Sequence, residues 1–127
     1  MARIKTQVLA RVAAGAATNN TFYYYLDMQE AGTHFQKAGV QFEWTPGGTG
    51  TVTVTIEATV QDDGTAAASC AYRDITTGTF GVASWTDDFM AIDNAERLAC
   101  FRHIRVKVVT LTTDANTAWT LYAKQIA

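Results

Sequence analysis

The run of residues 51–60, TVTVTIEATV, is the part of the chain that most restricts the fold. Val, Ile and Ala occupy its even positions, whereas Thr and Glu57 occupy its odd positions. Successive side chains of a β-strand point to opposite faces, so this alternation predicts a strand with one dry face and one wet face. Such strands are typical of antiparallel sheets that pack one face on a core.

Alternation of the same kind recurs along the chain, between short segments that favour turns. Because about eight antiparallel strands in two packed sheets is the number found in jelly rolls, the predicted fold is all-β: an antiparallel two-sheet β-sandwich, jelly-roll-like, with about eight strands. A length of 127 residues fits a single domain spanning residues 1–127. We expect a turn at 76–78, a long connection with at most one helical turn at 86–99, and strands at 3–12, 21–28, 40–44, 51–60, 66–73, 80–85, 101–111 and 118–126.

The period of two also predicts which side chains face the core. In the first strand Leu9 interrupts the alternation, and we expect Lys5, Gln7 and Arg11 to point outward and Ile4, Val8, Ala10 and Val12 to point inward. In the second strand, the residues expected inside are Phe22, Tyr24, Leu26 and Met28.

Two groups of outward positions are candidates for contact with another protein. Tyr23 and Tyr25 alternate with the inner residues of the second strand, and exposed aromatic patches mark protein contacts or sugar platforms, unless a loop covers them. His103, Arg105 and Lys107 share a face of the strand at 101–111, either as a solvated face or as a contact for an acidic partner. These five residues are the predicted interface residues.

Charge and hydrophobicity exclude two classes of partner. The formal net charge is −2, without the clustered Lys and Arg that nucleic-acid phosphates require. No segment approaches the roughly 20 apolar residues of a membrane-spanning helix. We therefore predict binding neither to nucleic acid nor to a membrane.

The chain contains residue types that serve in catalytic and metal sites, but their spacing does not match such sites. The two histidines, His34 and His103, lie outside any zinc-ligand spacing, and paired aspartates at 62–63 and 87–88 fit turn formation better than calcium binding. Glu43 and Glu57 could form a catalytic pair on neighbouring strands, or could simply be outward polar positions. We predict no enzymatic activity, no metal and no cofactor.

Cys70 and Cys100 lie in apolar surroundings and are expected to be buried free thiols. Free thiols fit a protein assembled in a reducing cytosol.

Five segments of the chain resemble small β-sandwich virion proteins of tailed bacteriophages, above all capsid decoration (cement) proteins. The segments are TVTVTIE at 51–57, DGT at 63–65, AYRDITT at 71–77, FRHIRVKVVT at 101–110 and LYAKQIA at 121–127. The resemblance covers roughly residues 40–127. It implies a jelly-roll-like fold, no catalytic residues, and dimers or trimers that bind the major capsid protein in the virion after assembly in the host cytoplasm.

Two alternatives remain open at this stage. Other phage sandwich proteins, including tail and fibre parts, share the same sequence rhythm. A carbohydrate-binding module is the other, suggested by the outward tyrosines together with Trp44, Trp85 and Trp119, although alternating runs favour core positions for the tryptophans.

Overall fold

The computed structural model describes residues 3–45, 52–80, 87–92, 101–110 and 113–127. The strands are β1 (Ile4–Val12), β2 (Thr21–Asp27), β3 (Gln29–Glu30), β4 (Thr33–His34), β5 (Lys37–Thr45), β6 (Val52–Thr59), β7 (Arg73–Phe80), β8 (Asp87–Ile92), β9 (His103–Thr110) and β10 (Ala118–Ile126), and a short 3-10 turn, η1, spans Ala67–Ser69. Among the described residues, no helix is long and apolar enough to cross a membrane.

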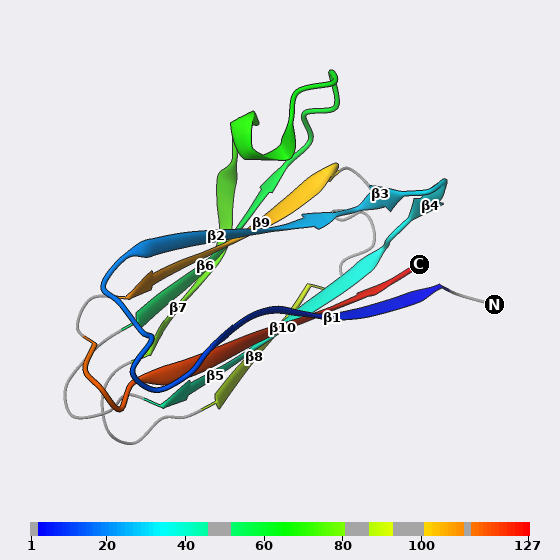
Figure 1. Ribbon diagram of the computed structural model, residues 1–127. Coiled ribbons are helices and arrows are strands. Elements are labelled where there is room, and N and C mark those ends of the chain that lie inside the picture. The colour runs from blue at the N-terminus through cyan, green and yellow to red at the C-terminus, as the bar shows by residue number, and fades with distance from the viewer. Residues whose placement is uncertain (1–2, 46–51, 81–86, 93–100, 111–112) are drawn as a thin grey trace.

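Two four-stranded antiparallel sheets lie face to face, with strand orders β1-β10-β5-β8 and β2-β9-β6-β7 (Figure 1). Setting aside the small β3–β4 hairpin, the first strand pairs with the last, the second with the second-last, and so inward to β6 and β7. This nested pairing is a long hairpin rolled into two sheets, which is the jelly-roll arrangement. The predicted two-sheet, jelly-roll-like β-sandwich is confirmed.

Three local predictions between residues 66 and 99 are wrong. Residues 67–69 form η1 instead of the strand expected at 66–73, residues 76–78 lie inside β7 instead of a turn, and β8 begins within the expected connection. The segment TAAASC at 65–70 offers few β-branched or large side chains to a sheet, which weakens its strand tendency. The strand predicted at 80–85 falls almost entirely outside the described residues.

The core consists of the inward positions of both sheets. In the opening run, Val52, Val54 and Ile56 are at most 2% exposed, as the alternation predicts. The inner face of β2 is also confirmed, with Leu26 and Met28 fully buried and with Phe22 and Tyr24 packed against the core. Trp119 of β10 contacts aromatic rings of both sheets, at 5.7 Å from Phe22, 6.3 Å from Tyr24 and 5.7 Å from Phe42 between ring centroids.

The predicted inward and outward positions of β1 are wrong before Leu9. The pairing of β1 with β10 shifts between Val8 and Ala10, so Leu9 is the extra residue of a β-bulge. One inserted residue exchanges the two faces of the strand on one side of the bulge. Ile4 and Val8 are therefore 59% and 50% exposed, whereas Lys5 and Gln7 are half-buried.

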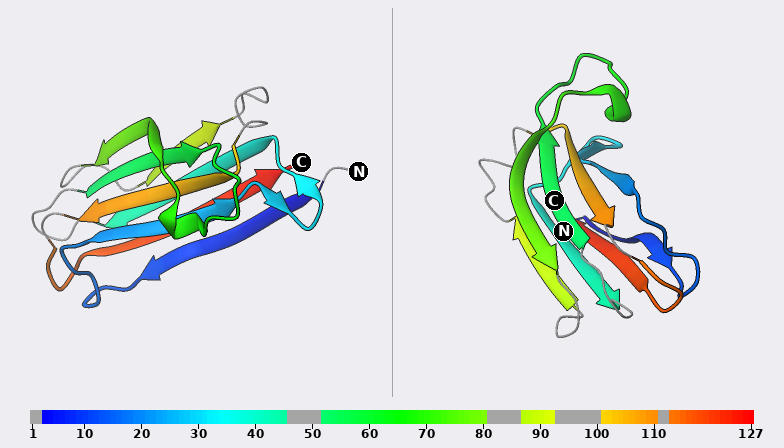
Figure 2. Two further views of the ribbon diagram at one scale, coloured as in Figure 1. Left: turned by 90° about the horizontal axis from the view of Figure 1, so that it is seen from above. Right: turned by 90° about the vertical axis from the view of Figure 1, so that its left-hand side faces the viewer.

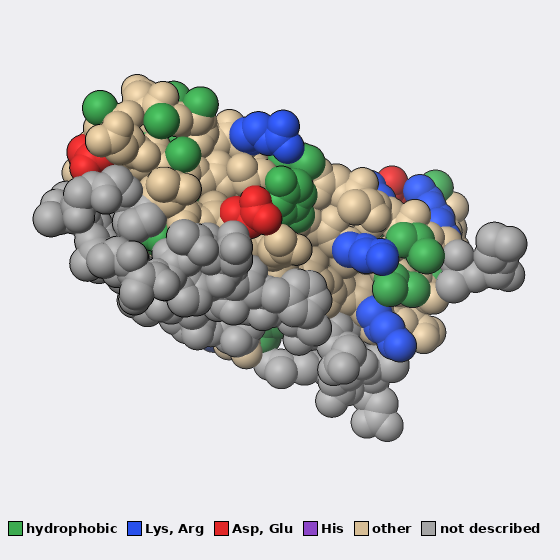
Figure 3. Space-filling view, turned by 90° about the horizontal axis from the view of Figure 1, so that it is seen from below, with side chains coloured by type: hydrophobic (Ala, Val, Ile, Leu, Met, Phe, Trp, Pro, Cys, Tyr) green, Lys and Arg blue, Asp and Glu red, His purple; other side chains and the backbone are tan. Residues whose placement is uncertain are grey.

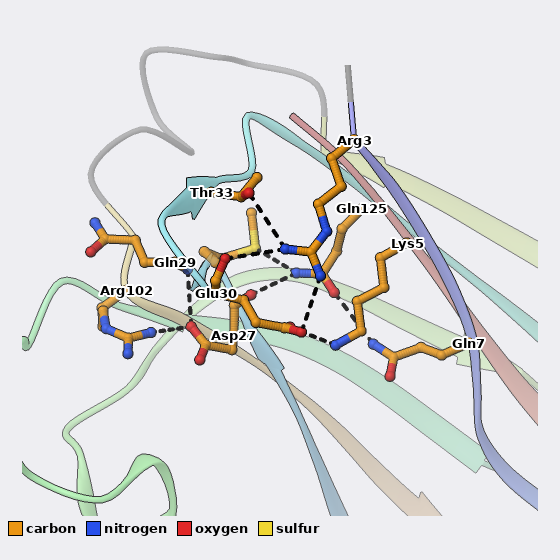
Figure 4. Close-up of polar contacts among 10 residues, drawn as sticks. Arg3, Lys5, Gln7, Asp27, Gln29, Glu30, Thr33, Arg102 and Gln125 are labelled. Atoms are coloured by element: carbon orange, nitrogen blue, oxygen red, sulfur yellow. Dashed lines mark hydrogen bonds and ion pairs between the residues drawn. The ribbon is translucent and has the colours of Figure 1, made fainter. Parts of the chain in front are cut away.

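The inward-turned polar residues of β1 join a network that links the two sheets near the β3–β4 hairpin (Figure 4). Lys5 Nζ lies 2.6 Å from Glu30 of β3. Gln125 of β10 is completely buried and donates from Nε2 to the backbone oxygen of Asp27 at 2.9 Å, while its Oε1 accepts from Gln7 at 3.3 Å. The network satisfies polar groups that this end of the sandwich would otherwise bury without partners.

Candidate protein-interaction surface

The two groups of predicted interface residues lie on one surface, the outer face of the β2-β9-β6-β7 sheet. β2 and β9 are neighbours, and their register places Tyr25 opposite Arg105 and Tyr23 opposite Lys107. The sequence placed these residues on separate strands, and the jelly-roll pairing of the second strand with the second-last brings them together. We call this group, with Glu57 and Tyr72, the tyrosine–arginine surface.

Arg105 is the centre of this surface. Its Nε and Nη2 atoms donate to the two carboxylate oxygens of Glu57 at 3.1 and 3.0 Å, because β6 places Glu57 directly opposite Arg105. The two side chains are only 19% and 13% exposed. Burial alone would lower the pKa of Arg105, but the hydrogen bonds and charge of Glu57 outweigh it and raise the pKa. The pair is therefore held as a fixed, charged fork.

Two tyrosine rings enclose the guanidinium group of Arg105. Its central carbon lies 4.7 Å from the centroid of the Tyr23 ring and 4.2 Å from that of Tyr72. The Tyr72 hydroxyl donates to the backbone oxygen of Ala67 at 2.8 Å. Burial, and then the charges of neighbours beginning with Cys70, raise the pKa of Tyr72 to about 12. Tyr72 is thus a neutral donor that anchors the cluster.

Sequence reasoning missed Tyr72 because it belongs to the connection between β6 and β7. This connection carries η1 and projects over the outer face of the sheet (Figure 2). No local period indicates where a loop residue lies relative to a sheet. The one available signal was an aromatic residue two positions after the cysteine at position 70, which is 8% exposed.

The predicted residues differ in how accessible they are. Tyr23 is 44% exposed, and Tyr25 and Lys107 are half-buried. His103 is only 9% exposed, next to Arg102, which bonds to Asp27 and to Asp62. Burial, and then the charge of Arg102, lower the pKa of His103, so the fold favours its neutral form. Direct contact with a partner is open to the tyrosines and Lys107 but not to His103.

The described residues do not form the acid pair considered from the sequence. Glu43 lies on β5 and Glu57 on β6, which belong to different sheets. Their strand neighbours Trp44 and Ile56 point into the core, so the two carboxylates lie on opposite outer faces of the sandwich. Within the described parts of the chain, no group of three His, Cys, Asp or Glu residues could hold a metal ion.

The tryptophans and cysteines also have defined places. Trp44 and Trp119 are 1% and 2% exposed, as expected for core residues. They offer no surface to a sugar. Cys70 is a buried free thiol, as predicted. Trp85 and Cys100 lie outside the described residues.

The opposite outer face, on the β1-β10-β5-β8 sheet, carries apolar side chains between cationic ones (Figure 3). A shallow groove of about 290 Å³ crosses it, lined by Thr6, Gly39, Gln41, Glu43, Tyr122, Ala123 and Lys124. Ile4 and Val8 add exposed apolar surface at the β1 side. The two outer faces of the sandwich therefore differ in the side chains that they expose.

No family model and no curated protein matches the chain. Among solved structures, a chain in the crystal structure of the T13 IBDV viral particle is similar over 98% of this chain, with a TM-score of 0.51 and 15% identity. A chain in the structure of infectious bursal disease virus Gx strain is similar over 99%, with a TM-score of 0.49 and 16% identity. This chain spans 31% and 33% of those two chains, about a third of their length. The first similarity shows a shared fold.

Proposed function

We propose that this chain is a structural protein of a virus particle and, more specifically, a capsid decoration (cement) protein of the tailed-phage type. The observation that supports the proposal most strongly is the fold, a jelly roll shared along 98% of the chain with part of an icosahedral virus particle. Double-sheet jelly rolls recur in viral capsid domains, and their outer faces, loops and sheet edges are available for contacts with neighbouring subunits. In this role the chain resides in the virion, after assembly in the host cytoplasm, and needs no cofactor or catalytic residue.

A decoration protein stabilises a shell by mass action. If it binds only the assembled lattice, each bound copy lowers the free energy of the assembled state relative to free subunits. Its partners are then the major capsid protein and other copies of itself, as a dimer or trimer. Such a role requires rigid contact surfaces rather than a reactive centre.

The tyrosine–arginine surface fits the contact with the capsid protein. Tyr and Arg are enriched among residues that dominate binding energies at protein interfaces. Here Glu57 and the tyrosine rings already hold Arg105 in one orientation, with centroid distances of 4.7 and 4.2 Å. A side chain that is ordered before binding loses little conformational entropy on binding.

The direct test is to locate the protein in its native source. Particles purified by gradient centrifugation are analysed by mass spectrometry and labelled with gold-conjugated antibody for electron microscopy. We expect label over the head. Label confined to the tail would favour the tail or fibre alternative, and particles free of the protein would refute a virion role.

A binding assay then tests the surface. We expect Tyr23→Ala to weaken co-sedimentation with undecorated heads, whereas Thr120→Ala, on the opposite sheet, retains it. Equal binding by both variants would remove the tyrosine–arginine surface from the capsid contact. For the carbohydrate-binding alternative, glycan-array binding lost on Tyr25→Ala would support it, and an unresponsive array would exclude it.

A further inference from the structure

β1 is an edge strand of its sheet within the described part of the chain. It pairs with β10 on one side, and no strand among the described residues pairs with its other side. Natural proteins usually protect such edges with charged side chains, proline or a bulge, since free backbone groups invite pairing with another chain. In β1 the bulge comes only at Leu9, so the stretch from Ile4 to Val8 keeps regular strand geometry.

The backbone of this stretch presents unpaired hydrogen-bonding groups to the outside. Ala127 N donates to Arg3 O at 2.9 Å, so Arg3 lies in a hydrogen-bonded pair with the end of β10. In an antiparallel ladder such pairs alternate with pairs whose backbone groups point away from the neighbour. The N–H and C=O groups of Ile4, Thr6 and Val8 therefore point to the free edge.

The side chains of the same stretch do not guard the edge. Ile4 and Val8 are 59% and 50% exposed on the outer face. Lys5, which could act as a protecting charge, instead turns inward to Glu30, with 2.6 Å between Nζ and Oε2. An exposed edge strand with apolar side chains on its outer face is the type of strand with which a further strand can pair.

We propose that β1 pairs with β1 of a second copy of this chain, antiparallel and about a two-fold axis at Thr6. Thr6 then lies opposite Thr6 of the other copy, Ile4 lies opposite Val8, and Val8 lies opposite Ile4. These are the residues whose backbone groups face the free edge, so each opposed pair exchanges two hydrogen bonds. The two sheets join into one continuous sheet across the dimer.

The pattern of side chains along β1 selects the register. In an antiparallel pair, directly opposed residues lie on the same face of the sheet. Even-numbered residues of this stretch face one side and odd-numbered residues the other, so the two-fold axis must pass through a residue and not between two residues. An axis at Lys5 would leave the apolar Ile4 opposite the polar Thr6, whereas an axis at Gln7 would place Ile4 opposite Ala10 across the bulge. The axis at Thr6 pairs apolar with apolar residues and sets Lys5 opposite Gln7.

This pairing would be the contact between copies that the proposed structural role requires. Its biological purpose rests on that proposed function. A contact of five residues per strand is small, so the dimer should form reversibly and with modest affinity. On a particle, attachment of neighbouring copies to one lattice raises their effective concentration and strengthens the same contact. The tyrosine–arginine surface belongs to the other sheet and stays free.

Cysteine cross-linking tests the register. Opposed Cα atoms in a hydrogen-bonded antiparallel pair lie about 5.5 Å apart, within the reach of a disulfide. We expect purified Thr6→Cys protein to form a disulfide-linked dimer on mild oxidation. Thr120→Cys, on the neighbouring strand of the same sheet, and the wild-type protein should stay uncross-linked. Monomeric Thr6→Cys, or cross-linking of both variants to the same extent, would overturn the proposed register.

Sedimentation equilibrium tests the association itself. We expect the wild-type protein to dimerise at high micromolar concentration and Val8→Lys to be monomeric with an unchanged circular dichroism spectrum. Val60→Lys is the matched control, because Val60 is 64% exposed but lies outside β1. A monomeric wild-type protein at that concentration, or dimeric Val8→Lys, would refute the pairing. Neither experiment uses capsids, so its failure is distinct from failure of the virion role.

Discussion

Removing Arg105 tests whether the tyrosine–arginine surface is held together by its buried ion pair. Arg105→Met keeps much of the aliphatic volume but leaves the Glu57 carboxylate, 13% exposed, without its fork of hydrogen bonds. Breaking a buried ion pair by removing one partner costs about 3–5 kcal/mol. Partial solvation of both groups reduces that cost, whereas two lost cation–π contacts add about 0.5–1 kcal/mol each. We expect a net loss of about 2–4 kcal/mol in the free energy of unfolding.

Urea unfolding followed by tryptophan fluorescence measures this loss. With a slope of about 2 kcal/mol per molar urea, which is typical of a small protein, the midpoint should fall by roughly 1–2 M. Arg11→Met is the control, because Arg11 is exposed and makes no ion pair within the described part of the chain. Its midpoint should stay close to that of the wild type.

The double variant Arg105→Met/Glu57→Leu separates the two parts of the cost. Replacing both members of a buried pair by apolar residues of similar size is often nearly neutral, because no unpaired charge remains. The double variant should therefore regain most of the stability lost by Arg105→Met alone. If Arg105→Met unfolds at the wild-type midpoint, or if the double variant is less stable than the single one, the ion pair does not hold this surface.

Three further perturbations test the core, the polar network and the pH response. Ile56→Ala should cost about 2–5 kcal/mol in urea unfolding, because Ile56 is completely buried, whereas Thr53→Ala should cost little; equal costs would contradict the assignment of faces. Gln125→Leu should cost about 1–3 kcal/mol, since it leaves the backbone oxygen of Asp27 without its donor, and an unchanged midpoint would exclude the network as a link between sheets. The lowered pKa of His103 means that the unfolded chain binds a proton more readily than the folded one. Stability should therefore fall as the pH drops from about 6.5, the ordinary histidine value, through the lower folded pKa. His103→Gln should weaken this dependence in unfolding curves taken across that range, and an identical dependence would contradict it.

Side-chain faces were predictable wherever the strand was regular. In β6 and β2, strict alternation placed Val54, Ile56 and Leu26 in the core and Tyr23 outside, and the structure agrees. A period of two leaves only one assignment once one face must be buried. The outward direction of Arg105 followed from the same rule, because Ile104 and Val106 beside it are fully buried.

Contacts that depend on topology or on a loop were not predictable. The pairing of β2 with β9, and so the contact between Tyr23 and Arg105, depends on how the chain rolls up over a long separation. Tyr72 reaches Arg105 from the connection between β6 and β7, where no period applies. Turn residues predict that a chain reverses but not which strand it joins next.

The wrong prediction of which β1 side chains face the core has a clear physical cause. Local periodicity favoured Ile4 and Val8 in the core, and one bulge at Leu9 placed both outside at 59% and 50% exposure. Leaving such side chains in water forgoes roughly 25 cal/mol for each Å² that a partner could cover. The bulge also turns Lys5 and Gln7 toward the buried network, where each has a partner. In a monomer, the bulge therefore leaves two apolar side chains exposed at an open edge. In the proposed dimer, whose axis lies at Thr6, Ile4 of one copy and Val8 of the other cover each other. If Ile4→Thr and Val8→Thr together leave both stability and self-association unchanged, this explanation of the bulge is wrong.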